Sequence, residues 1–217
     1  MASAHDKIIA AAAKSTLQPL GLRRKGQSRL WIGDHGWWLA VVEFQPSGFE
    51  KGSYLNVAAH WLWSNTGYIT FDLGGGADHG SRAAGFEAYR SEAQFEEAAS
   101  KLAEIAAQEV QNLTARLRSV NQAADFLVGR ERTARSGSWP AYNAGIAAGL
   151  AGRLDEADVM LSSVTDLRVK DIADRYASLT SDATRFREEA IAQIGGQREA
   201  LRLSDIDLAL PNIRSGM

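Results

Sequence analysis

The sequence predicts an α+β protein: an N-terminal helix on a four-stranded antiparallel meander covered by a long helix, followed by an all-helical C-terminal region. Between residues 28 and 73 apolar side chains recur with a period of two, which is typical of strands. Beyond about residue 90 the period becomes that of a helix, and no crossover helix fits between the strands. We therefore expect an α+β domain over residues 1–125 and a helical region over residues 126–217.

The first elements are a helix and a hairpin. Residues 3–19 begin with a serine that can cap a helix, continue through several alanines, and end where Pro19 and Gly21 interrupt the pattern. Residues 28–45 then predict an antiparallel pair of strands, because alternating apolar residues flank a tight turn of Gly33, Asp34, His35 and Gly36.

Two further strands complete the predicted meander. The first is expected at 54–63 and the second at 67–73, where it follows a turn and ends in three glycines. Alternation along the strand at 54–63 gives a core face with Leu55, Val57, Ala59, Trp61 and Trp63. The opposite face carries Tyr54, Asn56, Ala58, His60 and Leu62.

Helices account for the rest of the chain. Residues 91–119 predict a long amphipathic helix, because Ser91 and Gln94 match a capping box and apolar residues recur at helical spacing. Further helices are expected at 138–150, at 154–164, at 167–194 with a break near 180–182, and at 197–203. The tail after Ser204 is expected to be loosely ordered.

Composition and charge exclude several classes of protein. The 217 residues include no cysteine, which rules out a disulfide framework, a thiol nucleophile and a thiolate zinc site. A net charge of −2 gives no concentrated basic surplus, so we expect no nucleic-acid partner. The apolar run Ile8–Ala13 is too short for a signal peptide or a membrane span, so we expect a cytoplasmic protein that does not insert into a membrane.

Residues Pro19–Gly26, followed by Trp31, Val41–Gln45 and Tyr54–Val57, resemble the bacterial domain-of-unknown-function family 4304. In that family a helix leads into a segment with glycine and basic residues. A strand with an aromatic residue follows, then a strand that ends near Gln and a strand with an aromatic residue two positions before Asn. The resemblance covers about the first 120 residues. It implies an α+β domain and carries over no activity and no catalytic residue.

The stretch Tyr142–Val164 resembles one tetratricopeptide unit. Small, turn and bulky residues stand at the offsets of that repeat, namely Gly145, Gly152, Ala157 and Leu161. No second copy is found at 172–203, and such repeats need several neighbours to bury their faces. We therefore expect a single helical hairpin at 138–164.

Three kinds of catalytic or cofactor site are disfavoured. The glycine-rich stretch 74–82 suggests a phosphate loop, but Ser81 and Arg82 stand where the Walker pattern requires Lys and then Ser or Thr. Asp72, Asp78 and His79 are close in sequence, but the chain has no pair of histidines at metal-binding spacing. A serine-hydrolase elbow is absent from the sequence. We expect no metal and no cofactor.

Polar residues on neighbouring strands form the main candidate site. His60 shares a predicted strand face with Tyr54 and Asn56, and the adjacent strand can bring Glu43 and Gln45 alongside them. A solvated sheet face without a function explains the same pattern, because antiparallel sheets often expose one polar face.

Two functions are compatible with this face. We favour a binding or protein-interaction module without catalytic activity, in which Gln45, Asn56, His60 and Arg82 contact a protein partner or a small polar ligand. The alternative is a hydrolase-type enzyme that uses His60 and Glu43 as acid and base on an anionic substrate, with Arg82 on its anionic group. The sequence does not decide whether a reaction is catalysed, and it does not indicate an oligomeric state.

Aromatic and basic residues give two further candidates. Five of the six tryptophans fall within 33 residues and are expected mainly in the core, although Trp37 and Trp63 are candidates for an exposed interface anchor. The run Arg23–Lys25, with Arg29, is either a phosphate contact or a solvated strand entry.

Overall fold

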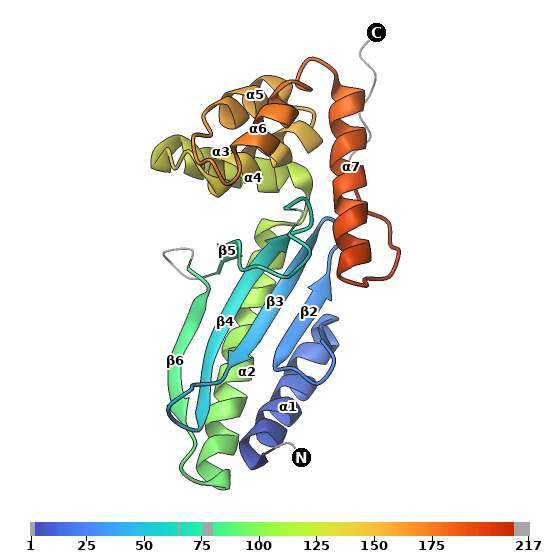
Figure 1. Ribbon diagram of the computed structural model, residues 1–217. Helices are drawn as coiled ribbons and strands as arrows, with labels where there is room; N and C mark the ends of the chain where they lie inside the picture. The colour runs from blue at the N-terminus through green and yellow to red at the C-terminus, as the bar shows by residue number, and fades with distance from the viewer. Residues whose placement is uncertain (1–2, 65, 76–79, 211–217) are drawn as a thin grey trace. The chain divides into compact units, whose positions relative to one another are not determined.

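The computed structural model describes residues 3–64, 66–75 and 80–210. It is an α+β structure with an antiparallel sheet, as the sequence predicts (Figure 1). The chain divides into two compact units, the first made of Met1–His60 with Ile69–Ala115 and the second of Trp61–Tyr68 with Arg116–Met217. We call them the sheet unit and the helical unit. The predicted boundary between residues 125 and 126 lies inside a helix, α3 (Val120–Ala134).

The sheet has the strand order β1-β2-β3-β4-β5, with β6 also paired to β4. Because β6 pairs with residues 52–56 of β4 and β5 pairs with residues 58–59, the two strands follow one another along the same edge. The strands are β1 (Arg23–Arg24), β2 (Leu30–Asp34), β3 (Trp38–Gln45), β4 (Gly52–Trp61), β5 (Leu73–Gly74) and β6 (Arg82–Ala88).

Two helices lie along one face of this sheet, α1 (Ala4–Leu17) and α2 (Glu92–Arg116) (Figure 1). A capping box between Ser3 and Asp6 begins α1, and a turn that ends at Gly21, with a left-handed φ of 84°, follows it. The β2–β3 pairing runs from Leu30 opposite Glu43 to Asp34 opposite Leu39. The helices predicted at 3–19 and 91–119 and the hairpin predicted at 28–45 are therefore confirmed.

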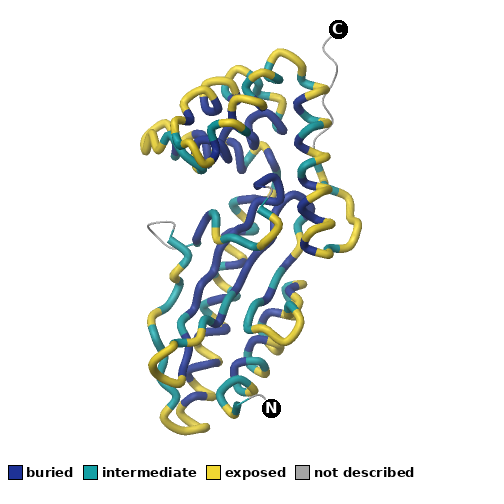
Figure 2. The backbone as a smooth tube through the Cα atoms, in the orientation of Figure 1, coloured by how far each residue is buried: buried dark blue, intermediate teal, exposed yellow. Residues whose placement is uncertain are grey.

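The tryptophan cluster lies in the core. Burial is almost complete along β3 and β4 (Figure 2). Five tryptophans on or next to strands β2, β3 and β4 are buried, namely Trp31, Trp37, Trp38, Trp61 and Trp63. The expectation that Trp37 or Trp63 forms an exposed interface anchor is wrong, because these two side chains are only 3% and 0% exposed. Ring packing accounts for part of the burial, since Trp61 and Trp63 stack at 5.1 Å between centroids.

The strand predicted at 67–73 is wrong. Only its last residue belongs to a strand, because β5 begins at Leu73. Upstream of it, the Asp72 N–H donates to the Ala59 carbonyl of β4, but the Gly67 N–H donates to Gln197 Oε1 and the Thr70 N–H donates to His60 Nδ1. The fourth long strand of the sheet is instead β6, which was not predicted because its sequence, with three alanines and a glycine, has low strand propensity.

The helical unit contains α3, α4 (Trp139–Leu150), α5 (Leu154–Ser162), α6 (Lys170–Ala177) and α7 (Ala183–Ala200). These bounds confirm the predicted helices at 138–150 and 154–164 and the break near 180–182. A separate helix at 197–203 is wrong, because α7 continues through Gly195 and Gly196. Burial of Ile194 and Gln197 on either side of the glycines stabilises the helix there. The helix α3 was not predicted.

The hairpin of α4 and α5 depends on close contact between the helices. A Cβ atom added at Gly145 would lie 2.5 Å from Leu161 Cγ, so only glycine permits this approach. Gly152, with φ of 79°, follows α4 and lets the chain reverse. The single helical hairpin predicted at 138–164 is thus present. Among the described residues, no helix has the length and apolar character needed to cross a membrane.

Candidate functional site

A network of polar side chains joins β3, β4 and β6. The amide of Asn56 donates to Glu43 Oε2 at 2.9 Å and to Gln45 Oε1 at 3.0 Å. Arg82 Nη2 donates to the same Gln45 oxygen at 3.0 Å, and its guanidinium lies 4.2 Å from the centroid of the Tyr54 ring. We call these five residues the polar cluster. The structure therefore brings together three of the four predicted site residues, Gln45, Asn56 and Arg82.

The polar cluster holds two unneutralised charges. Within the part of the chain that the structure describes, neither the Glu43 carboxylate nor the Arg82 guanidinium makes an ion pair. Arg82 is exposed, while Asn56 is buried and fixed by two hydrogen bonds. A buried amide whose Nδ2 group donates to two acceptors is held in one orientation, so the surrounding groups are pre-organised.

His60, the fourth predicted site residue, belongs to a different group. Its Nδ1 atom lies 2.7 Å from Thr70 Oγ1 and 3.2 Å from Asp72 Oδ2, and the imidazole is fully buried. His60 lies four positions after Asn56 on β4, which corresponds to about 13 Å along a strand. Asn56 contacts Glu43 directly, so His60 and Glu43, the predicted acid and base, lie in separate groups.

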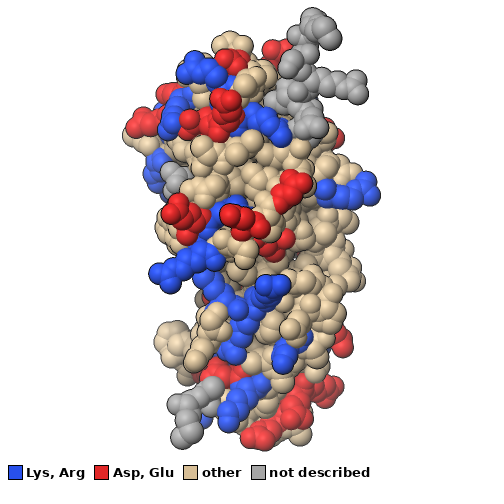
Figure 3. All heavy atoms as spheres, turned by 90° about the vertical axis from the view of Figure 1, so that its right-hand side faces the viewer, with Lys and Arg blue, Asp and Glu red and all other residues tan. Residues whose placement is uncertain are grey.

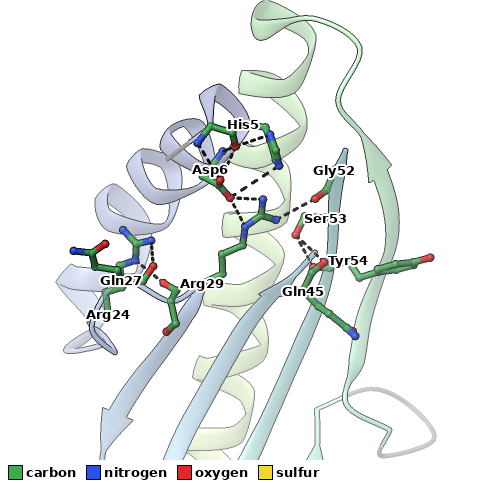
Figure 4. Close-up of polar contacts among 11 residues, drawn as sticks. His5, Asp6, Arg24, Gln27, Arg29, Gln45, Gly52, Ser53 and Tyr54 are labelled. Atoms are coloured by element: carbon green, nitrogen blue, oxygen red, sulfur yellow. Dashed lines mark hydrogen bonds and ion pairs between the residues drawn. The ribbon is translucent and has the colours of Figure 1, made fainter. Parts of the chain in front are cut away.

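Beside the polar cluster, a cavity of about 780 Å³ opens at one end of the sheet (Figure 4). The beginning of α1, the segment before β2 and the end of β3 form its walls. We call it the sheet-end cavity; its lining residues are His5, Asp6, Lys25, Gln27, Ser28, Arg29, Leu30, Glu43 and Pro46. Glu43 belongs to both the cavity and the polar cluster.

An ion pair between Asp6 and Arg29 stabilises the wall of this cavity. Arg29 donates to Asp6 Oδ1 from Nε at 2.7 Å and from Nη2 at 2.5 Å, and its Nη1 donates to the Gly52 carbonyl at 3.0 Å (Figure 4). Burial alone would raise the pKa of Asp6, but hydrogen bonds from Ser3 and Arg29 outweigh it and lower the pKa to about 2. The Asp6 carboxylate is therefore ionised at neutral pH and pairs with the Arg29 guanidinium.

His5 supplies a neutral polar group to the same wall. Its Nδ1 atom lies 2.8 Å from Ser3 Oγ. Burial lowers the pKa of His5; Asp6 opposes this shift, and the positive charges of Arg29 and Lys51 add to it. The imidazole is consequently uncharged at neutral pH and can both donate and accept a hydrogen bond.

Two charged groups in the cavity, Lys25 and Glu43, form no ion pair among the described residues. Among the described residues, the Lys25 ammonium has no hydrogen bond or ion pair, and the Glu43 carboxylate accepts one bond, from Asn56. The sheet-end cavity therefore offers a cation and an anion to a ligand, together with the neutral imidazole of His5 and the side chains of Gln27 and Ser28.

Sequence reasoning missed His5 and Asp6 as site residues. The spacing of Ser3 and Asp6 is a local signal for a capping box and predicts where Asp6 lies on the first helical turn. It does not predict the partner, because Arg29 is 23 residues away and reaches Asp6 only in the folded sheet unit.

The other candidate sites add no further chemistry. Asp72 is engaged by His60, while Asp78 and His79 lie outside the described residues, as does part of the glycine-rich stretch 74–82. Within residues 3–64, 66–75 and 80–210, no three His, Asp or Glu side chains are grouped so that they could hold a metal ion.

Comparison of the chain with protein-family models, with curated proteins and with solved structures finds no match. The resemblance to the domain-of-unknown-function family 4304 and the likeness to one tetratricopeptide unit therefore stay predictions. Function has to be argued from the geometry of the polar cluster and the sheet-end cavity.

Proposed function

We propose that this protein is a non-catalytic binding module that recognises a small polar ligand at the sheet-end cavity and the polar cluster. One observation carries the proposal. Glu43 lines the cavity and also accepts the Asn56 amide, which is bonded in turn to the Gln45 oxygen that Arg82 contacts. A ligand in the cavity would thus meet groups that the fold has already fixed, which reduces the entropic cost of binding.

The charges favour a ligand that carries both signs. Lys25 in the cavity and Arg82 in the polar cluster can each neutralise a carboxylate or a phosphate, and Glu43, which belongs to both, can accept from an ammonium or a hydroxyl. A cavity of about 780 Å³ falls within the range of roughly 300–1,000 Å³ that small-molecule sites occupy. We therefore propose a zwitterionic ligand of the amino-acid or short-peptide class. A cytoplasmic location stays a prediction.

The rival hydrolase function receives less support. Direct proton transfer needs the acid or base within about 3 Å of the reacting group, or one water away. His60 is fully buried and about 13 Å along the strand from the residue that holds Glu43. Its neighbours Thr70 and Asp72 occupy the imidazole, which suits a role in the packing of the segment before β5.

The test is a thermal-shift screen of free amino acids and dipeptides, followed by calorimetry on any that bind. Glu43→Gln removes a charge at constant size, and Arg82→Gln replaces the guanidinium with a shorter neutral amide. Each should weaken binding by tenfold or more, because a hydrogen bond to a charged group contributes about 1.5–3 kcal/mol. Glu96→Gln, an exposed change on α2, is the matched control and should have no effect. Binding that is unchanged in Glu43→Gln and Arg82→Gln would contradict the proposal. Ligand turnover that is lost in His60→Ala would favour the hydrolase.

A further inference from the structure

The beginning of the chain is basic although the whole chain is not. Residues 3–33 contain six Lys and Arg residues and one acidic residue, Asp6, whereas the full sequence has a net charge of −2. Asp6 is already neutralised by Arg29 at 2.5 Å. Figure 3 shows Lys and Arg side chains gathered over the face of the sheet unit formed by α1 and β1.

This face is hollowed. Two adjoining depressions of about 390 and 590 Å³ run along the C-terminal half of α1, and they share Ala11, Lys14 and Gln18. Leu22 and Trp31, both buried, contribute apolar atoms to the first depression, and Arg23 lies on its rim. We call the two depressions together the α1–β1 groove. No described residue that lines it is acidic.

The cations of the groove are available to a partner. Within the described residues, Lys14 and Arg23 make no ion pair and their side chains have no hydrogen bond, and both are exposed. Arg24 differs, because its guanidinium donates to the carbonyls of Gln27 and Ser28 at 2.8 and 2.6 Å. Arg24 stabilises the turn that follows β1, while Lys14 and Arg23 can pair with an external anion.

The groove runs beside an open edge of the sheet. Among the described strands, β1 pairs only with β2. The Lys25 N–H donates to the Leu30 carbonyl at 2.8 Å, so Lys25 faces β2. Neighbouring residues of an antiparallel strand point their backbone groups to opposite sides, so Arg24 directs its N–H and C=O outward. An extended peptide can use such groups by adding a strand.

We infer that the α1–β1 groove is a second binding site, distinct from the polar cluster, that takes an extended acidic segment of a partner protein. Carboxylates of the segment would meet Lys14 and Arg23, its backbone would pair with Arg24, and small apolar side chains would lie on Ala11 and Trp31. The apolar floor and the free backbone favour a peptide over nucleic acid, whose binding depends on more phosphate contacts than these few cations offer.

The experiment measures fluorescence anisotropy of a fluorescein-labelled peptide of alternating Glu and Val, titrated with the full chain. We expect saturable binding that weakens as NaCl rises from about 50 to about 500 mM. Lys14→Glu and Arg23→Glu should each reduce the affinity roughly tenfold, because reversal replaces an attraction with a repulsion. Lys101→Glu, an exposed charge reversal on α2 away from the groove, should change it less than about twofold.

Two further probes separate strand addition from general charge attraction. A peptide of alternating Glu and Pro keeps the charge but lacks the N–H donors of the replaced residues, and it should bind several-fold more weakly. The inference is overturned if Lys101→Glu weakens binding as much as Arg23→Glu, or if the Pro peptide binds equally well. It is also overturned if duplex DNA or phosphatidylserine vesicles bind more tightly than the Glu–Val peptide with the same sensitivity to Arg23→Glu.

Discussion

Gly149 lies where α4 comes closest to Phe186 of α7. A Cβ atom added at Gly149 would overlap the ring of Phe186, which is fully buried. We expect Gly149→Ala to destabilise the protein by about 1–3 kcal/mol, because overpacking outweighs the gain in helix propensity of about 1 kcal/mol. Urea unfolding followed by circular dichroism measures the change.

The matched control is Gly195→Ala in the exposed part of α7. A Cβ atom at Gly195 would have no heavy atom within 4 Å, so the variant gains helix propensity without a clash. It should raise stability by about 0.5–1 kcal/mol. If Gly149→Ala stabilises the protein as much as Gly195→Ala does, α4 and α7 are not packed as described.

The ion pair of Asp6 and Arg29 predicts a dependence of stability on acid pH. The folded pKa of Asp6, about 2, lies below its ordinary value of about 3.9. The ionised carboxylate therefore contributes stability above about pH 4, and this contribution is lost as the pH falls through about 2. The stability difference between the wild type and Asp6→Asn should be constant from pH 7 to about 4 and then shrink. Urea unfolding at each pH measures it.

An exposed carboxylate provides the comparison for Asp6. Asp155 lies in the first turn of α5. Asp155→Asn should leave the stability below about pH 4 almost unchanged, because this side chain has no ion pair among the described residues. A difference between the wild type and Asp6→Asn that persists at pH 2 would mean that the carboxylate does not titrate with a lowered pKa.

At the scale of elements, the segment Thr66–Tyr68 depends on a single glutamine of α7. Gln197 is buried; it accepts from the Gly67 N–H at 2.9 Å and donates to Thr66 Oγ1 at 3.1 Å. Gln197→Ala should destabilise the protein by about 1 kcal/mol and speed amide exchange at Gly67. Gln108→Ala, which removes an exposed contact with Asn112, should do neither. Unchanged exchange at Gly67 would show that Gln197 does not anchor the segment.

The contacts of Gln197 illustrate why some elements could be predicted from the sequence and others could not. The helices α1 and α2 and the β2–β3 hairpin depend on local periodicity, capping residues and turn residues, all of which are visible in the sequence. Residues 67–72 alternate as a strand does, and the Asp72 N–H donates to the Ala59 carbonyl, but Gly67 and Thr70 donate to the side chains of Gln197, 130 positions away, and His60. Local pattern cannot reveal such partners, and tertiary contacts override it.

The candidate site, too, could be predicted from the sequence only in part. Gln45 and Asn56 could be predicted as neighbours, because β3 and β4 are successive strands and alternation puts both residues on one face. Arg82 joins them through β6, a strand whose alanines and glycine hide it in the sequence. His60 shares the strand face but not the contacts, since alternation predicts a face and says nothing about separation along it.

At the scale of the whole molecule, the chain passes from one unit to the other more than once. The segment Trp61–Tyr68 interrupts the sheet unit and belongs to the helical unit, which resumes at Arg116. In that segment Trp63 is fully buried and donates from Nε1 to Asn143 Oδ1 at 3.0 Å. Its carbonyl accepts from the hydroxyl of Tyr142 at 3.0 Å and from Gln193. No single cut of the chain can therefore separate the complete units.

We accordingly expect the fragment 116–217 to lack the stability of the intact helical unit. Without Trp63, Asn143 Oδ1 loses its donor and the Tyr142 hydroxyl loses its acceptor, although Gln193 still donates to that hydroxyl at 3.0 Å. Each buried group left without its partner costs about 1–3 kcal/mol, in addition to the cavity left by the ring. Near-UV circular dichroism of the fragment should be weak and its urea transition broad. Trp139→Phe in the full chain changes a half-buried tryptophan that packs on the Tyr142 ring at 5.8 Å between centroids and keeps an aromatic ring there, so it should keep a sharp transition. A fragment that unfolds as sharply as the full chain would mean that α3–α7 fold without the segment Trp61–Tyr68, and its integration into the helical unit would then not contribute to stability.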